Sequence, residues 1–246
     1  MTSQAVESRG ADLPQPAELE SLVRQVLDEA KRLGASAAEA GVSLEAGLSV
    51  TVRLGEVETL EYHRDRGVGV TVYFGQRKAS ASSSDFAPQA LRETVRAACD
   101  IARYTSEDDC AGLADAALMA KEIPDLDLCH PWGIDAARGI EIAQRCEAAA
   151  RDTDERISNS EGATLSSHQG LRVYGNSHGF IAGYPSTRHS LSCSVIAGRD
   201  EHMQRDYWYS VARRHEDLEA AEHVGRMAAE RTLRRLNGRK LGTRQV

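Results

Sequence analysis

Strict alternation of apolar and polar residues is the feature that most restricts the fold of this chain. From Leu48 to Leu54 every second residue is aliphatic, and the pattern returns from Val68 to Phe74. A period of two rich in β-branched residues predicts strands with one buried face. Glycines at positions 55, 67, 69 and 75 punctuate the run. We therefore expect an antiparallel meander with one apolar face that needs a cover.

Four helical segments could supply that cover. Apolar residues at helical spacing predict helices over 16–33, 88–104 and 218–236, and a further helix capped by Asp135 with Ala150 on its inner face. Asp85 is the expected N-cap of the second helix, and Asn237-Gly238 ends the fourth. The remaining patterned segments, 37–44 and 156–213, read as strands, the first turning at 45–47 into the meander.

Blocks of strands between helices favour an α+β fold over a doubly wound parallel one. We predict two layers, a mostly antiparallel sheet covered by helices, with duplicated helix–strands–helix halves. One domain is expected over 16–240, with halves at about 16–104 and 134–237. The connection 105–133 between them includes a short helix near 116–120, and residues 1–15 are expected to be disordered.

Composition narrows the class of protein. The chain has 246 residues and a net charge of −7, so it is not an obvious nucleic-acid binder. Its five cysteines include no CxxC pair, which favours free thiols in a reducing cytoplasm. No signal core and no membrane-length apolar run occur.

The nearest approach to a catalytic motif is His215-Glu216. A zinc protease helix needs a second histidine one turn later. HExxH spacing would require histidine at 219 and HExxxH at 220, where this chain has Glu219 and Ala220. The next histidine, His223, lies more than two turns away. We interpret the acidic residues here as the solvated start of the fourth helix.

Other chemistry-bearing residues are weighed against simpler roles. A metal held by scattered histidines is one alternative, drawn from His63, His130, His168, His178, His189 and His202. Ser160 and Ser80–Ser84 do not lie in the GxSxG motif of a serine nucleophile. Gly67-Val68-Gly69 lacks the third glycine of a dinucleotide-binding motif. Cys193 is expected to be buried and therefore unreactive. We therefore name no catalytic, cofactor-binding or metal-binding residue.

Two surface features remain. A basic cluster comprises Arg226, Arg231, Arg234, Arg235, Arg239 and Lys240. Cations complement a helix C-terminus, and a contact face for a further domain is an equal alternative. The Ser-rich segment Ala79–Ser84 reads as a solvent-facing strand, with pairing to an extended peptide as the functional alternative.

The segment RGVGVTVYFGQRKASASSSD, which ends at Asp85, resembles the PmbA (TldE) branch of the TldD/PmbA metallopeptidase family. The likeness extends through GLSVTVRLGEVETLEYHRD upstream and CDIARYTSEDDCAGLAD downstream, and covers about Leu19 to Leu241. It implies that a mostly β domain follows, with residues 241–246 starting the linker. The chain would then be the N-terminal domain of a longer subunit.

The resemblance also implies a function. It suggests a non-catalytic subunit of a cytoplasmic complex with a TldD-type partner, whose HExxxH helix holds zinc, while this chain holds no cofactor. Substrates would be unfolded peptides such as microcin precursors and labile antitoxins, and the chain could form a homodimer when alone. Two alternatives stay open: a regulatory binding module of the DNA gyrase modulator type, and an independent hydrolase with a histidine-bound metal.

Overall fold

The computed structural model describes residues 14–239 and 242–243. Its helices and strands follow the order α1 (Pro16–Arg32), β1 (Ala37–Arg53), β2 (Glu56–Phe74), β3 (Arg77–Ser83), α2 (Pro88–Tyr104), α3 (Ala136–Arg151), β4 (Ile157–Asn176), β5 (Ile181–Ala197), β6 (Gln204–Ala212) and α4 (Ala221–Arg234). The strands form one antiparallel sheet in the order β3-β2-β1-β4-β5-β6. The predicted α+β class is confirmed. Of the segment 1–15 that is expected to be disordered, residues 1–13 lie outside the described part, and so do residues 240–241 and 244–246 near the expected linker.

The chain divides into two compact units that interleave in sequence. Unit 1 comprises residues up to Ala46, Arg64–Cys129 and Gln169–Ser186, and unit 2 comprises the remaining segments. β1, β2, β4 and β5 each contribute residues to both units. The domain boundaries inferred from the sequence stay a prediction. No helix in the described residues is long and apolar enough to span a membrane.

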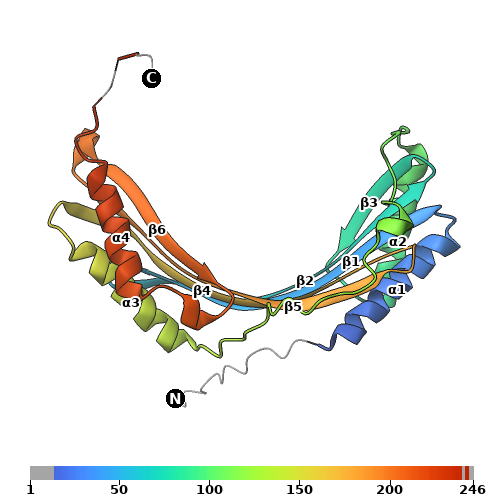
Figure 1. Ribbon diagram of the computed structural model, residues 1–246, viewed down its shortest axis with the longest axis horizontal. Coiled ribbons are helices and arrows are strands. Elements are labelled where there is room, and N and C mark those ends of the chain that lie inside the picture. Colours follow the sequence, from blue (N-terminus) through green and yellow to red (C-terminus); the bar gives the residue numbers. More distant parts are fainter. Residues whose placement is uncertain (1–13, 240–241, 244–246) are drawn as a thin grey trace. The chain divides into compact units, whose positions relative to one another are not determined.

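In unit 1, α1 and α2 pack together over strands β1 to β3 (Figure 1). Pro16 begins α1 and Pro88 begins α2, where a missing backbone N–H costs nothing. The core joins the apolar stripes of both helices to alternating strand residues, among them Leu19, Val23, Val26, Val42, Val68, Val70, Val72, Leu91 and Val95. The predicted amphipathic pattern is thus confirmed in this unit.

In unit 2, α3 and α4 pack against each other, and α4 lies along β6 (Figure 1). Asp135 caps α3 as predicted, because its carboxylate accepts the backbone N–H of Arg138. The core includes Leu48, Val50, Val52, Ala143, Cys146, Leu165, Leu191, Cys193, Val195 and Val224. The same core also contains small side chains, which allow the helices to approach the sheet closely: Ala150, Ala163, Ala221, Ala228 and Ala229.

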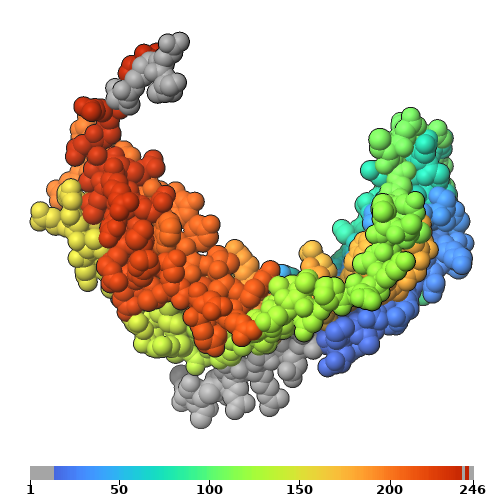
Figure 2. All heavy atoms as spheres, in the orientation of Figure 1, coloured from blue at the N-terminus to red at the C-terminus, as the bar shows by residue number. Residues whose placement is uncertain are grey.

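The connection between α2 and α3 lies on the surface of unit 1 up to Cys129, drawn in green in Figure 2. The short helix expected near 116–120 is a 3-10 turn over Ala116–Leu118, capped by Asp115. The backbone N–H of Asp108 donates to the carbonyl of Gln76, which ties the connection to the turn after β2.

One expected turn is absent. β1 runs without interruption from Ala37 to Arg53, so the turn predicted at residues 45–47 is wrong. A Cβ at Gly47 would lie 2.4 Å from His168 Nδ1 and 2.8 Å from the carbonyl of Ser167. The glycine therefore serves the close approach of β4 to β1 and does not reverse the chain.

Two helix starts also differ from expectation. Asp85 does not cap α2, because its carboxylate accepts the N–H of Ala87 in a local turn that precedes the helix at Pro88. The fourth helix begins at Ala221, three residues later than predicted, since Leu218 and Ala220 have extended backbones.

Candidate functional site

The segment that most resembles a catalytic motif does not begin as an α-helix. His215–Asp217 form a single 3-10 turn ahead of α4, so the predicted solvated helix start is wrong here. The His215 ring stacks on Trp132 at a centroid distance of 4.7 Å with nearly parallel planes. The imidazole is therefore used for packing within unit 2.

Glu219 is also engaged within unit 2. Its carboxylate accepts a hydrogen bond from the Trp208 indole N–H at 3.0 Å and lies 3.4 Å from His223 Nε2. Within the described residues no group of three or more His, Cys, Asp or Glu side chains is arranged to hold a metal. The side chains of this segment do not fit a zinc site.

The remaining histidines are distributed over both units. His63 stacks on His168 at 5.5 Å, His178 Nε2 lies 3.1 Å from the carbonyl of Ala114, and His202 is close to Glu201. The structure therefore does not bring the sequence-predicted histidines together as a metal-binding set in the part of the chain that it describes.

His189 lies in the core of unit 2 beside a serine. Its Nδ1 is 3.0 Å from Ser167 Oγ, and its Nε2 is 3.0 Å from the carbonyl of His130. Since a carbonyl only accepts, Nε2 carries the proton and Ser167 donates to Nδ1. Burial lowers the pKa of His189 below its ordinary value of 6.5. With 1% of its surface exposed, His189 is a satisfied core residue and no base for an external substrate.

The other candidate nucleophiles have structural roles. Ser160 is buried, and its hydroxyl accepts the N–H of Gly162 inside β4. Cys193 is buried as predicted. A hydrogen bond with Cys193, together with burial, raises the pKa of the Cys146 thiol. Neither thiol has the exposed, thiolate-favouring surroundings of a reactive cysteine.

The basic cluster is partly used within unit 2. Arg231 and Arg235 lie 3.4 Å and 3.7 Å from the Asp206 carboxylate, and Arg231 also covers the Trp208 ring. Burial by itself would raise the pKa of Asp206, but the hydrogen bond from the backbone N–H of Tyr207 and the two nearby cations outweigh it, so that the pKa is lowered. Lys240 lies outside the described residues. The cluster therefore contributes to the packing of α4 on β6.

The Ser-rich segment is an edge strand, as expected. β3 lies at one end of the sheet and pairs with β2, with Ser82 opposite Gly69 and Ser80 opposite Thr71. Beside it a shallow trough of about 550 Å³ crosses unit 1. Its lining residues are Gly41, Val42, Ser43, Gly67, Val68, Gly69, Ser82, Ser83, Ser84, Arg172, Val173 and Tyr174.

Two tyrosines and a carboxylate form a cluster beside this trough. Tyr73 and Tyr174 donate hydroxyl hydrogen bonds to the two oxygens of Glu39, at 2.9 Å and 2.8 Å. Burial and the neighbouring carboxylate raise the pKa of Tyr73 to about 12. Both phenols therefore stay protonated at neutral pH and hold Glu39 in place.

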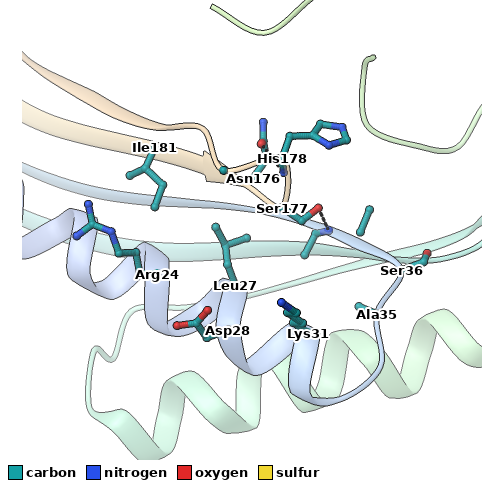
Figure 3. Close-up of a pocket in the computed structure, with 13 residues that line it drawn as sticks. Arg24, Leu27, Asp28, Lys31, Ala35, Ser36, Asn176, Ser177, His178 and Ile181 are labelled. Carbon is teal, nitrogen blue, oxygen red and sulfur yellow. Dashed lines mark hydrogen bonds between the residues drawn. The ribbon is translucent and has the colours of Figure 1, made fainter. Parts of the chain in front are cut away.

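A second hollow in unit 1, of about 470 Å³, lies between α1 and the turn after β4 (Figure 3). Arg24, Asp28 and Lys31 line one side. On the other side, the hydroxyl of Ser177 accepts the N–H of Ala38. Arg24, on the α1 side, is paired with Glu20. The hollow mixes charges of both signs, so it selects no particular class of ligand.

Sequence reasoning missed Glu39, Tyr73, Tyr174 and Arg172. Tyr73 gave a signal, since it is an aromatic residue at a position where the alternation predicts the polar face. Two glycines inside an otherwise regular strand, Gly67 and Gly69, gave another.

Comparison with known families places these features in context. The family model described as PmbA/TldA metallopeptidase domain 1 matches residues 38–102 of the sequence. The family model described as PmbA/TldA metallopeptidase central domain matches residues 129–236. The chain is 53% identical to "Metalloprotease PmbA" of Escherichia coli O157:H7 over 206 residues, 84% of this chain and 46% of that protein.

A further relative and two solved structures agree. A "Metalloprotease PmbA homolog" from Haemophilus influenzae is 46% identical over 94% of this chain and 51% of its own length. A proposed modulator of DNA gyrase from Bacteroides thetaiotaomicron superposes with a TM-score of 0.82 at 24% identity, over 91% of this chain and 51% of that one. TldE from Thermococcus kodakarensis gives 0.67 at 14% identity, over 86% and 47%. At these identities the structures show the fold alone, and the chain spans about half the length of the curated relatives.

Proposed function

Because this chain belongs to the PmbA/TldD metallopeptidase family, we propose that it is the N-terminal part of a PmbA-type subunit that supports peptide hydrolysis without supplying the zinc ligands. A TldD-type partner would bind zinc and activate the attacking water. The substrates would be unfolded or extended peptides, and the complex would work in the cytoplasm.

The observation that carries this proposal is the state of the His215–Ala220 segment. It has Glu219 and Ala220 where a zinc helix of this family type would have its second histidine. Its only histidine stacks on Trp132, and Glu219 is bonded to Trp208. These contacts support an architectural role for the segment.

The test is a peptidase assay on an unfolded peptide, with the full-length protein alone, its TldD-type partner alone, and both together. We expect hydrolysis only in the mixture, and its loss when a chelator removes zinc. Chelator-sensitive hydrolysis by the full-length protein alone would contradict the proposal. It would instead support the independent hydrolase.

A second candidate function is a regulatory binding module. It is favoured by the description of the Bacteroides structure as a proposed modulator of DNA gyrase. Purified full-length protein, without the partner, would then change the rate of DNA supercoiling by gyrase. An unchanged rate over a wide range of protein concentration would remove this alternative.

A further inference from the structure

Three glycines lie side by side on neighbouring strands of unit 1. Gly41 belongs to β1, and Gly67 and Gly69 belong to β2. All three line the trough, while the residues next to them in sequence, Val42 and Val68, are buried in the core. The floor of the trough is therefore bare backbone on the face of the sheet opposite the core.

The folded chain itself does not require glycine at these positions. A Cβ at Gly69 would meet no heavy atom within 4 Å, and at Gly67 and Gly41 the nearest atoms would be 3.7 Å and 3.9 Å away. None of the three has a positive φ. Glycine inside a strand is unfavourable, and it often marks a place where another backbone or a ligand approaches closely.

Other glycines of the sheet show the contrast. A Cβ at Gly47 or Gly183 would come within 2.5 Å of atoms on a neighbouring strand. Those two glycines are explained by packing inside the chain. At Gly69 the corresponding space is empty, which points to an external occupant.

The rim of the trough indicates the chemistry of that occupant. Ser43, Ser82 and Ser84 contribute hydroxyl groups, which can both donate and accept hydrogen bonds. Among the residues that line the trough, Arg172 alone carries a charge, and its side chain is exposed. A guanidinium group suits a carboxylate in a two-point contact. Beside it, the hydrogen bond to Glu39 holds Tyr174 in position.

We propose that this trough binds an extended, acidic peptide segment whose backbone lies over Gly67 and Gly69 and whose carboxylate meets Arg172. The choice of a peptide rests on the proposed function in peptide hydrolysis, whereas the position and the charge preference come from the trough itself. This mode uses the face of the sheet and is independent of strand addition at the edge of β3.

The main test is Gly69→Val in the full-length protein. The probe is a fluorescein-labelled ten-residue peptide of alternating Thr and Glu, and its binding is followed by fluorescence anisotropy. We expect about tenfold weaker binding or more, because the branched side chain fills the trough. We also expect Tm to stay equal or rise, since valine favours strands and no atom obstructs it.

Gly112→Val is the matched control. A Cβ at Gly112 also meets nothing within 4 Å, but this residue lies in the connection and not in the trough. The control should bind the peptide as the wild type does. Unchanged binding by a folded Gly69→Val protein would overturn the proposal, as would equal loss of binding in the control.

Arg172→Gln provides a second, independent readout. It should abolish the preference for the Glu peptide over a version with Gln in place of Glu, while Tm stays unchanged. If Gly69→Val fails to fold, this variant decides the question, and a retained preference would overturn the proposal. No binding of the Glu peptide to the full-length protein would also overturn it, and would favour a face covered by the rest of the chain or by a second copy.

Binding and hydrolysis are measured separately, so the two proposals can fail separately. Loss of peptidase activity in the mixture with intact peptide binding would contradict the subunit role alone. Activity in the mixture with no binding at the trough would contradict this inference alone.

Discussion

A buried carboxylate holds the turn between β1 and β2 in unit 2. Glu147 is 1% exposed, and its two oxygens accept the backbone N–H groups of Leu54 and Gly55 at 2.6 Å and 2.7 Å. Both turn residues have positive φ. A buried charge is tolerated when its hydrogen bonds are complete, and here the backbone supplies two.

We expect Glu147→Gln to lower the free energy of unfolding by about 1–3 kcal/mol, because the amide can accept only one of the two bonds and turns an N–H₂ group toward the other donor. Chemical denaturation measures the change. Glu141→Gln, on the exposed surface of the same helix, should change stability by less than about 0.5 kcal/mol. Equal stability of both variants would argue against a structural role for Glu147.

His189 should make stability depend on pH. Burial holds its pKa below 6.5, so the folded protein binds a proton at this residue less readily than the unfolded chain does. Its contribution to stability is complete above the ordinary pKa and falls as the pH drops through about 6.5. The neighbouring His215 also lowers the pKa of His189, whereas the hydrogen bond to the carbonyl of His130 raises it.

The measurement is chemical denaturation of the wild type and His189→Gln between pH 7.5 and pH 5. Glutamine can donate to the carbonyl of His130 but does not titrate, so the variant should lose less stability over this range than the wild type. His202→Gln, at an exposed site, is the control and should follow the wild type. Parallel curves for all three proteins would refute the role of His189.

At the scale of elements, the contact between α3 and α4 depends on one glycine. A Cβ at Gly225 would lie 2.0 Å from the carbonyl oxygen of Cys146 and 3.0 Å from the backbone N of Ala150. Since both atoms belong to the backbone of α3, no rotamer change can relieve the overlap. The two helices can pack this closely only because α4 has no side chain at this position.

We therefore expect Gly225→Ala to destabilise the protein by about 3 kcal/mol, near the upper end for overpacked cores, although alanine favours helices. Thermal unfolding followed by circular dichroism would show the change. Gly133→Ala, where a Cβ meets nothing within 4 Å, should shift stability by less than about 1 kcal/mol. A Gly225→Ala protein as stable as the wild type would mean that α3 and α4 pack less closely than described.

At the scale of the whole molecule, the proposed function predicts that the TldD-type partner binds zinc and that this protein does not. The described residues hold no group of side chains suited to a metal. Under the proposed function, the zinc would belong to the partner. The full-length protein purified alone should contain much less than one zinc per chain, and its complex with a TldD-type subunit about one per pair. Elemental analysis would check this, and stoichiometric zinc in the protein alone would contradict it.

Local patterns by themselves determined most elements. The prolines at 16 and 88 and the carboxylate of Asp135 act where helices begin, and such signals depend only on nearby backbone groups. The alternation in β1 and in the second half of β2 likewise depends on which face is buried, and the blocks of strands between helices then favoured the α+β class. The absence of a second histidine after His215 was also evident from spacing alone.

Only the tertiary structure decided what depends on contacts between distant segments. Gly47 resembled a turn residue, but it makes room for His168, more than a hundred positions away, so β1 continues through it. Likewise, Glu39, Tyr73 and Tyr174 lie on three different strands and meet only in the folded chain. Gly67 and Gly69 line a trough only because β4 places Arg172 on the same face of the sheet. Periodicity shows which face of a strand is buried, whereas the neighbours of that face depend on strand order, which no local pattern contains.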